Sequence, residues 1–187
     1  MSPPGCPKDE CRSAGYEGPL MSGGVDDKPE GFRRVCAALA IQGHAHVPLW
    51  LEVAARTSQE AADALGVAVG QIAKSVIFRR KGDERAVLVV TSGDRRVDEK
   101  KVAAITGALG RADAEFVKAR TGFSIGGVAP LAHAHPEGEP PLTLIDRELF
   151  RFAEIWAAAG HPNGVFRLAP AELEPLTGAP VHDVSQS

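Results

Sequence analysis

A segment suited to binding through its backbone lies at residues 121–130, Thr-Gly-Phe-Ser-Ile-Gly-Gly-Val-Ala-Pro. Gly126 and Gly127 can adopt positive φ angles at little steric cost and let a ligand approach the main chain. Successive N–H groups turned to one side bind an anion, or a carbonyl oxygen that becomes negative during a reaction. Ser124 carries a hydroxyl that could hydrogen-bond a ligand or stabilise the turn. The alternative interpretation is a buried turn whose glycines only permit tight packing.

A second candidate is Lys74, within the β-branched and aromatic run Gln-Ile-Ala-Lys-Ser-Val-Ile-Phe at residues 71–78, which predicts a strand. Alternation along a strand places Lys74 on the same face as Ile72, Val76 and Phe78. A lysine on an apolar face needs an anionic partner, such as the phosphate or carboxylate of a ligand. A structural ion pair with one of the chain's own acids, or a position at the frayed start of the strand, explains the pattern equally well.

Other residues that could do chemistry are histidines. His161 follows Gly160 on a second loop rich in glycine, proline and asparagine, where it could contact a substrate or have no role. The pairs His44/His46 and His133/His135 have spacings that could hold zinc, but neither lies in a His-Glu-x-x-His motif or near a cysteine. Neither a nucleophilic serine elbow nor a Walker loop is present. We therefore expect neither a metal nor a cofactor.

The elements that must position these residues can be read from hydrophobic periodicity and capping signals. The strands outnumber the helices and do not alternate with them regularly, which favours a mixed sheet of α+β type, barrel-like and flanked by helices. Thr57 and Glu60 form a capping box, and Gly43, Gly66, Gly107 and Gly178 mark helix ends. The expected helical segments are 32–42, 57–65, 98–106, 116–120 and 170–177, and the expected strands are 44–48, 71–78, 86–91, 142–145, 154–157 and 165–168.

The chain of 187 residues is long enough for one well-buried domain. Residues 1–30 are rich in proline, glycine, serine and charge, which predicts a disordered extension before a domain at 31–187. No stretch approaches the roughly 20 apolar residues of a membrane helix, and no secretory signal is visible. Three cysteines without metal-finger spacing look incidental. We expect a cytoplasmic protein that binds no membrane.

Charge is distributed unevenly along the chain, whose net charge is −3. Residues 73–120 hold twelve lysines and arginines against seven acids, 12 − 7 = +5, whereas residues 121–187 hold three against eight, 3 − 8 = −5. A basic patch on an acidic protein suits transient binding of a nucleic acid through its phosphates. Local ion pairs on a solvated face are the alternative. Because no recognition helix is visible, we expect no binding of DNA.

Several motifs occur together in one order: Leu65-Gly66, the run at 71–75, Gly-Asp-Arg-Arg-Val-Asp at 93–98, and Gly-Phe-Ser-Ile-Gly-Gly-Val-Ala-Pro at 122–130. In this order the chain resembles the YbaK/ProX family of trans-editing aminoacyl-tRNA deacylases, whose domain is also inserted in bacterial prolyl-tRNA synthetases. The similarity continues through Asp146 and the segment 156–168, covering roughly residues 32–185. Several motifs in order and at matching spacing are more specific than any one alone.

The resemblance implies a compact mixed-sheet fold that hydrolyses the ester joining a wrong amino acid to the 3′ end of a tRNA. It implies that Lys74, followed by Ser75, contacts a phosphate or the terminal adenosine. It also implies that the loop from Gly126 to Pro130, through Gly127, Val128 and Ala129, holds the aminoacyl group with its main-chain donors. An aminoacyl ester is already activated, so a positioned water and an oxyanion-binding backbone suffice without a protein nucleophile.

The implied partners are mischarged aminoacyl-tRNA and an aminoacyl-tRNA synthetase. Where cysteine-specific members have serine and aspartate, this chain has Ala158 and the neighbourhood of Val165 and Phe166. Small residues at 157–159, together with His161, predict a pocket for alanine, serine, threonine or another small amino acid such as cysteine. Two rival hypotheses are a catalytically silent regulator of the same fold that binds tRNA or an amino acid, and a metal-dependent hydrolase.

Overall fold

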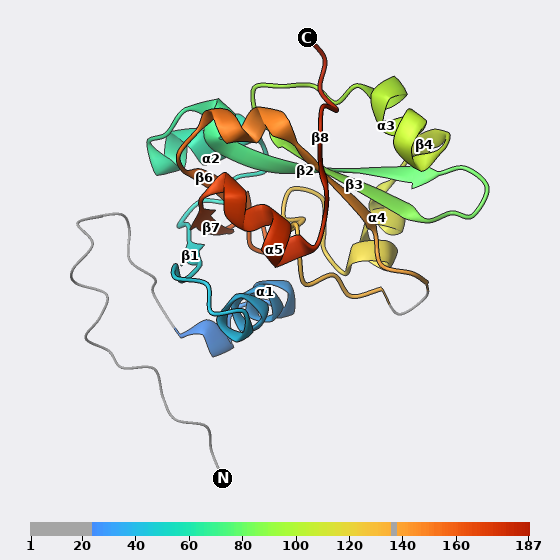
Figure 1. Cartoon of the computed structure of the whole chain (residues 1–187). Helices are drawn as coiled ribbons and strands as arrows, with labels where there is room; N and C mark the ends of the chain where they lie inside the picture. Colours follow the sequence, from blue (N-terminus) through green and yellow to red (C-terminus); the bar gives the residue numbers. More distant parts are fainter. Residues whose placement is uncertain (1–23, 136–137) are drawn as a thin grey trace.

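The computed structural model of the chain describes residues 24–135 and 138–187 (Figure 1). The α-helices are α1 (Glu30–Ile41), α2 (Ser58–Leu65), α3 (Glu99–Thr106), α4 (Ala114–Thr121) and α5 (Leu173–Thr177). The strands are β1 (Leu49–Trp50), β2 (Ile72–Arg80), β3 (Ala86–Ser92), β4 (Leu109–Arg111), β5 (Leu142–Asp146), β6 (Ile155–Ala158), β7 (Gly164–Leu168) and β8 (Val181–His182). Short 3₁₀ turns are η2 (Val25–Asp27), η3 (Val69–Gln71), η4 (Arg147–Arg151) and η5 (Pro170–Glu172).

The strands form one mixed sheet in the order β1-β7-β6-β2-β3-β5-β8, with β4 paired to β2. β2 and β3 are antiparallel and pair Lys74 with Thr91, whereas β6 runs parallel to β2 and β5 runs parallel to β3. Parallel and antiparallel pairs in one sheet, with helices that do not alternate with the strands, are the expected α+β arrangement. The predicted fold class is therefore confirmed.

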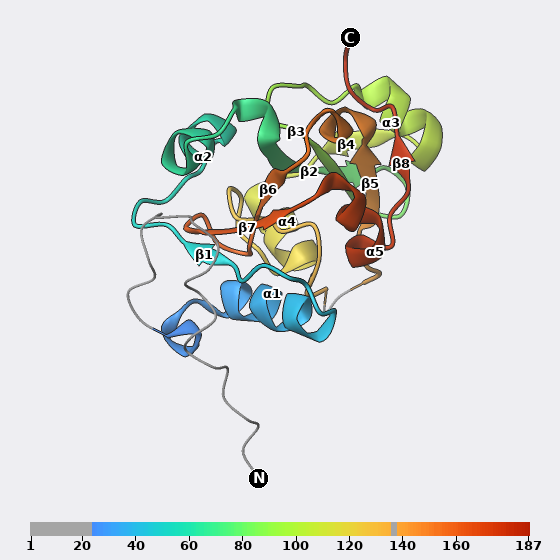
Figure 2. The ribbon, with the colours of Figure 1, turned by 60° about the vertical axis from the view of Figure 1, so that its left-hand side comes forward.

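Both faces of the sheet are covered by helices. On one face, α1, α4 and α5 pack on a core that includes Phe32, Leu88 and Phe123. On the other face, α2 packs on Ile72, Trp156 and Val165, while Val102 of α3 packs on Val87 and Val89 of β3. Figures 1 and 2 show α1 on the opposite side of the sheet from α2 and α3. Because β3 is central, all seven of its residues are buried.

Most expected elements are present within a few residues of their predicted ends. The capping box of α2 is formed, because the Thr57 hydroxyl accepts from the Glu60 N–H and the Glu60 carboxylate accepts from the Thr57 N–H. Gly66 and Gly178 end α2 and α5 in the left-handed conformation. The predicted turn at 116–120 is a full helix, α4, which Asp113 caps through the Phe116 N–H.

The expectation of a strand at 44–48 is wrong, because the strand in this region is β1, immediately after it. The His44 N–H donates to the Leu39 carbonyl at the end of α1, and the His44 ring pairs with the Arg167 carbonyl at 2.8 Å. Pro48 has no N–H to give to a sheet. Sequence patterns also missed β4 and β8, whose two or three residues are too few to show a period.

The predicted boundary between an extension at residues 1–30 and a domain at 31–187 stays a prediction. Residues 1–23 of the expected extension lie outside the described residues. Phe32 and Val35 of α1 have no exposed surface, so the core of the domain begins on α1. Among the described residues, no helix is long and apolar enough to cross a membrane.

Candidate functional site

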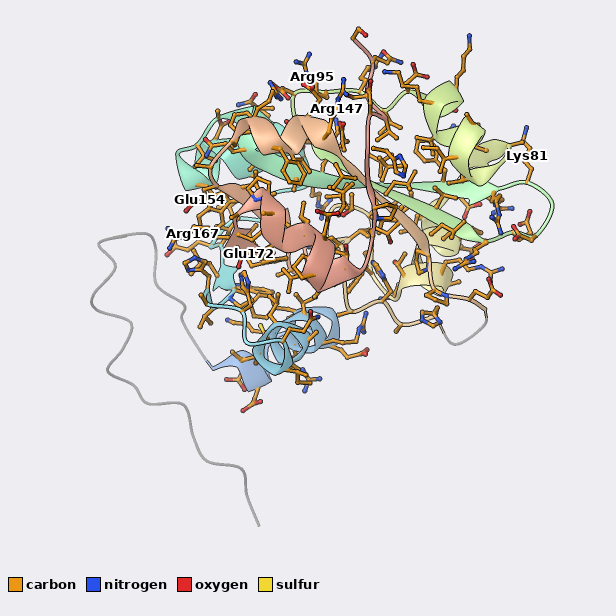
Figure 3. All side chains as sticks on the ribbon, in the orientation of Figure 1. Lys81, Arg95, Arg147, Glu154, Arg167 and Glu172 are labelled. Atoms are coloured by element: carbon orange, nitrogen blue, oxygen red, sulfur yellow. The ribbon has the colours of Figure 1, made fainter. Side chains whose placement is uncertain are left out.

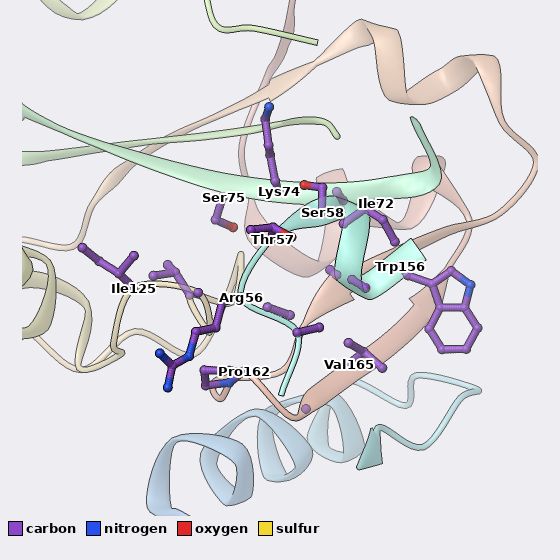
Figure 4. Close-up of a pocket in the computed structure, with 18 residues that line it drawn as sticks. Arg56, Thr57, Ser58, Ile72, Lys74, Ser75, Ile125, Trp156, Pro162 and Val165 are labelled. Atoms are coloured by element: carbon purple, nitrogen blue, oxygen red, sulfur yellow. The ribbon is translucent and has the colours of Figure 1, made fainter. Parts of the chain in front are cut away.

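A cavity of about 290 Å³ opens between the start of α2, the first half of β2, the glycine loop (residues 121–134) and the β6–β7 hairpin (Figure 4). Its polar wall contains Arg56, Thr57, Ser58, Lys74 and Ser75. The rest of the wall is apolar or backbone, contributed by Ala55, Ala61, Ile72, Ala73, Ile125, Gly126, Val128, Trp156, Ala157, Ala158, Pro162, Gly164 and Val165. The cavity thus brings together the two segments singled out in the sequence, the Lys74 strand and the glycine loop.

The start of α2 is fixed at the rim of the cavity by Glu60. Its carboxylate accepts from the N–H groups of Arg56 and Thr57, at 2.8 and 3.0 Å. These hydrogen bonds, first the one from Arg56 and then the one from Thr57, hold the pKa of the Glu60 carboxyl below its usual range. The capping box, read in the sequence only as a helix signal, therefore also places three residues of the cavity wall.

Lys74 donates from Nζ to the Arg95 carbonyl oxygen at 2.6 Å. Figure 4 shows its side chain extending from β2 away from Arg56 and Pro162, while Ser75 leaves the strand on the other side. Burial lowers the pKa of the Lys74 ammonium, with Asp94 opposing that change and Arg96 adding to it. An ammonium has three donors, so the one hydrogen bond leaves capacity for an anionic ligand.

A polar network fixes the loop that carries the Arg95 carbonyl. The Ser92 hydroxyl lies 2.5 Å from the Gly70 carbonyl and 2.7 Å from the Asp94 carboxylate. Arg151 donates to the same Asp94 carboxylate at 2.8 Å. Burial opposes ionisation of Asp94, but the hydrogen bonds from Arg151 and Ser92 hold its pKa below the usual range. An Arg95–Glu148 ion pair of 3.0 Å ties the loop to η4.

Ser75 lines the cavity, and its Oγ has no hydrogen-bond partner among the described residues although it is buried. A buried polar atom without a partner costs free energy, and such groups in native structures call for an explanation. A ligand group in the cavity that hydrogen-bonds to this hydroxyl would supply one. The sequence motif had indicated Ser75 only by its place after Lys74.

In the glycine loop, Gly126 and Val128 line the cavity, and Gly126 has a φ of +89°. The Gly127 N–H donates to the Ser124 carbonyl at 3.0 Å and closes a turn. Gly127 itself packs on the backbone of His161, where an added Cβ would lie 2.7 Å from the His161 Cα. Ser124 is exposed, whereas Ala129 and Pro130 are buried, and none of the three is among the residues that line the cavity.

The second predicted loop contributes Pro162 and Gly164 to the cavity wall rather than Gly160 and His161. The His161 ring stacks on Trp50 with 4.9 Å between ring centroids, and burial lowers its pKa. Its Nδ1 accepts from the Asn163 N–H at 3.1 Å. Gly160, with a φ of +82°, packs against the start of α1. Substrate-binding roles for Ser124, Ala129, Pro130, Gly160 and His161 stay predictions.

Part of the basic stretch 73–120 is paired with acids among the described residues. Arginines and lysines at five positions form ion pairs, namely Arg79 with Glu84, Arg80 with Asp83, Arg85 with Glu139, Arg95 with Glu148 and Lys101 with Asp183. Figure 3 shows Lys81 and Arg95 well apart on the molecule. The alternative of local ion pairs is therefore favoured over one continuous basic patch.

The histidine pairs take part in packing. His44 lies edge-on to Phe166, and the Nδ1 of His46 is 3.2 Å from Arg167. His133 contacts the Ala129 carbonyl through Nε2 at 2.8 Å and lies edge-on to Phe123. Among the residues that the structure describes, no three His, Cys, Asp or Glu side chains are grouped so that they could hold a metal ion.

We expect His133 to make the fold less stable in acid. Burial lowers the pKa of this ring from 6.5 to about 4. The unfolded chain then binds the proton at a higher pH than the folded chain, so stability falls as the pH drops from about 6.5 towards about 4. The loss from this group amounts to at most about 3 kcal/mol.

The measurement is urea unfolding at several pH values. Replacing His133 by Gln, which keeps a donor for the Ala129 carbonyl, should flatten the profile in this window relative to wild type. The matched variant His182→Gln, on edge strand β8, should follow wild type. A His133→Gln profile parallel to that of wild type would contradict the prediction.

Comparisons with known proteins identify the family of this chain and structures of similar fold. The aminoacyl-tRNA editing domain family matches residues 52–176. The uncharacterized protein YwhH of Bacillus subtilis (strain 168) is 35% identical over 123 residues, which are 65% of this chain and 75% of that protein. A solved structure described as a "putative trans-editing enzyme for prolyl tRNA synthetase" is 38% identical with a TM-score of 0.76, covering 86% of this chain and 99% of that one.

A second solved structure, of the hypothetical protein APE2540, is 29% identical with a TM-score of 0.74, and it covers 82% of this chain and 99% of its own. The matched segment 52–176 contains the start of α2, the Lys74 strand, the glycine loop and the β6–β7 hairpin, which together build the cavity. The resemblance seen in the sequence motifs is thereby confirmed. The chain belongs to the aminoacyl-tRNA editing domain family.

Proposed function

We propose that this protein is an aminoacyl-tRNA deacylase that releases a wrongly attached small amino acid from the 3′ end of a tRNA. The observation that carries the proposal is the composition of one cavity. Its wall combines Lys74, the Ser75 hydroxyl, which has no hydrogen-bond partner among the described residues, and the loop residues Gly126 and Val128. Family membership supports the same reaction class.

In the proposed reaction, a water oxygen attacks the ester carbonyl carbon. The carbonyl oxygen becomes negative, and backbone N–H groups stabilise it. The bond from the carbonyl carbon to the ribose oxygen then breaks, and this oxygen takes up the proton that the attacking water loses, leaving the free amino acid and a tRNA with a free hydroxyl. The Gly127 N–H is occupied in its turn, so Gly126 and Val128, which line the cavity, are the proposed donors, and Gly127 gives the loop its shape.

Lys74 is proposed to bind the acceptor end of the tRNA. Its ammonium lies on a partly buried face, where its charge is less favourable than in water, so a phosphate there gains more than it would on an exposed surface. The Arg95 carbonyl orients the ammonium through one donor and leaves the others for the ligand. The proposal needs no cofactor, and it places the protein in the cytoplasm with its tRNA substrates.

The cavity wall favours an apolar amino-acid side chain. Ala61, Ile72, Trp156 and Val165 line it and belong to the apolar cluster under α2. With the Ser75 hydroxyl assigned to the α-ammonium group of the substrate, these four apolar residues are left to contact its side chain. We therefore expect alanine to be released about tenfold or more faster than serine, the order of selectivity that apolar pockets reach.

The test uses a proline-specific tRNA, because one solved relative is linked to prolyl-tRNA synthetase. The tRNA is charged separately with alanine, serine, threonine and cysteine, and the release of each amino acid is followed with time. Release of alanine ahead of serine and threonine would support the assignment, and the variant Ser75→Ala should raise KM without changing that order. Preference for serine would instead assign Ser75 to the side-chain hydroxyl.

The outcome that would replace the proposal is binding without turnover. If the protein binds the charged tRNAs but releases no amino acid, it is a regulator that uses the editing fold for recognition. The synthetase that makes the mischarged tRNA is the partner expected under the deacylase proposal. Adding a metal chelator to the active protein should leave the rate unchanged, since every proposed group is a side chain or a backbone amide.

A further inference from the structure

Helix α1 lies before the segment that matches the family, since it ends at Ile41 and the match begins at residue 52. It nevertheless contacts both loops that contribute to the cavity, namely the glycine loop and the turn at 160–164. Figure 2 shows α1 lying beside β1, β7 and α4. Three of its side chains, Phe32, Val35 and Leu39, are buried in the main core, so its position is fixed.

The first contact joins two backbones. Gly31 of α1 and Gly160 of the β6–β7 turn meet without side chains, and a Cβ added at Gly31 would lie 2.5 Å from the Gly160 carbonyl oxygen. A Cβ added at Gly160 would meet the Gly31 carbonyl in turn. The Phe123 ring also packs here, because the same added Cβ at Gly31 would lie 3.2 Å from its Cδ1 atom. No methyl group fits here without moving backbone.

This contact continues to the cavity through His161. The His161 backbone packs on Gly127, and the next residue, Pro162, lines the cavity. The turn at 160–164 is therefore held between α1 on one side and the glycine loop on the other. Close-packed backbones transmit a displacement rather than absorb it, so a shift at Gly31 moves the turn towards Gly127.

A second contact fixes the other half of the glycine loop. Arg34 of α1 donates from Nε to the Ala132 carbonyl at 2.7 Å, and its guanidinium lies 4.6 Å from the centroid of the Phe123 ring. Ala132 has a φ of +60°, which is uncommon for a residue with a side chain. Such a conformation persists only where surrounding contacts hold it, and Arg34 supplies one.

We propose that α1 positions both the 160–164 turn and the glycine loop: Gly31 sets the place of the turn, and Arg34 holds the glycine loop at Ala132. Both are positioning residues, because neither lines the cavity. The inference rests on the proposed deacylase function for its kinetic consequence, but not for its structural one. Misplacing a catalytic group by about 1 Å can cost about 100-fold in rate.

The experiment compares two variants with two matched controls in the full chain. Gly31→Ala is paired with Gly24→Ala, because Gly24 has a negative φ and nothing within 4 Å of an added Cβ. Arg34→Gln is paired with Arg33→Gln, at an exposed position of the same helix. The amide resonances of Gly126 and Gly127 are followed by NMR, and kcat and KM are measured for release of alanine from tRNA.

The expected result is that Gly31→Ala and Arg34→Gln shift both glycine amides and lower kcat about tenfold or more, while KM stays within about twofold. Both controls should leave amides and rates at wild-type values. Unshifted amides with unchanged kcat in a folded Gly31→Ala would overturn the inference. If Gly31→Ala does not fold, the glycine amide resonances and kcat of Arg34→Gln test the inference in the same way. Shifted amides with no turnover even in wild type would uphold positioning and refute the deacylase.

Discussion

Replacing Lys74 by methionine should lower kcat/KM for tRNA deacylation by about 100-fold, the loss expected when a charge-assisted hydrogen bond to a substrate phosphate is removed from a partly buried site. Methionine keeps the apolar stem and removes the ammonium. Burial disfavours the Lys74 charge, and removing this charge offsets the loss of the hydrogen bond to the Arg95 carbonyl. We therefore expect activity to fall while the melting temperature holds or rises.

The measurement is single-turnover release of amino acid, with thermal unfolding followed in parallel. Lys100→Met serves as the matched control, because Lys100 is an exposed residue of the same basic stretch. It should retain wild-type kcat/KM at low salt and at physiological salt. A Lys74→Met protein within about threefold of wild type would remove Lys74 from the site and leave the backbone donors to act alone.

The variant Gly127→Ala should lower kcat/KM by a similar factor, about 100-fold, for a different physical reason. Its Cβ would lie 2.7 Å from both Cα and C of His161 and 2.9 Å from its N, all of them backbone atoms. Either the glycine loop or the 160–164 turn must move, and both carry cavity residues. Overpacking of this kind costs about 1–3 kcal/mol of stability.

Kinetics for this variant are compared well below its melting temperature, so that the folded fraction stays constant. Gly110→Ala, on β4, is the control, because the nearest atom to its added Cβ is 3.5 Å away. Its rate and melting temperature should stay close to those of wild type. If Gly127→Ala melts lower yet keeps its kcat/KM, the loop has a structural role only and the cavity is not the reaction site.

The fold could be predicted where sequence signals are local and regular. The β-branched and aromatic run around Lys74 and the capping box at Thr57 each predicted an element of the correct type. Sequence signals gave the wrong position where contacts between distant segments determine the structure. β1 was predicted a few residues too early, because the His44 ring takes a backbone carbonyl of β7 as its partner, which no local pattern encodes.

Two segments of the site, the Lys74 strand and the glycine loop, were predicted from the sequence, but the apolar residues that complete the cavity wall were not. Lys74 and Gly126 are marked by unusual residue types in their contexts, and both line the cavity. Ile72 and Trp156 also line it, yet they read in sequence as ordinary strand residues. Their role follows from the parallel pairing of β2 with β6, which sets them side by side. Such long-range pairing cannot be read from one sequence without the fold.

The burial of β3 on both faces has a consequence for measuring stability. Its neighbours β2 and β5 pair with both of its edges, and Leu88 and Val89 face two different apolar clusters. Partial opening at either cluster leaves the other intact, so the amide hydrogens of β3 reach solvent only when the whole chain unfolds. Their exchange rates therefore report the global free energy of unfolding, separately from any loosening of the loops around the cavity.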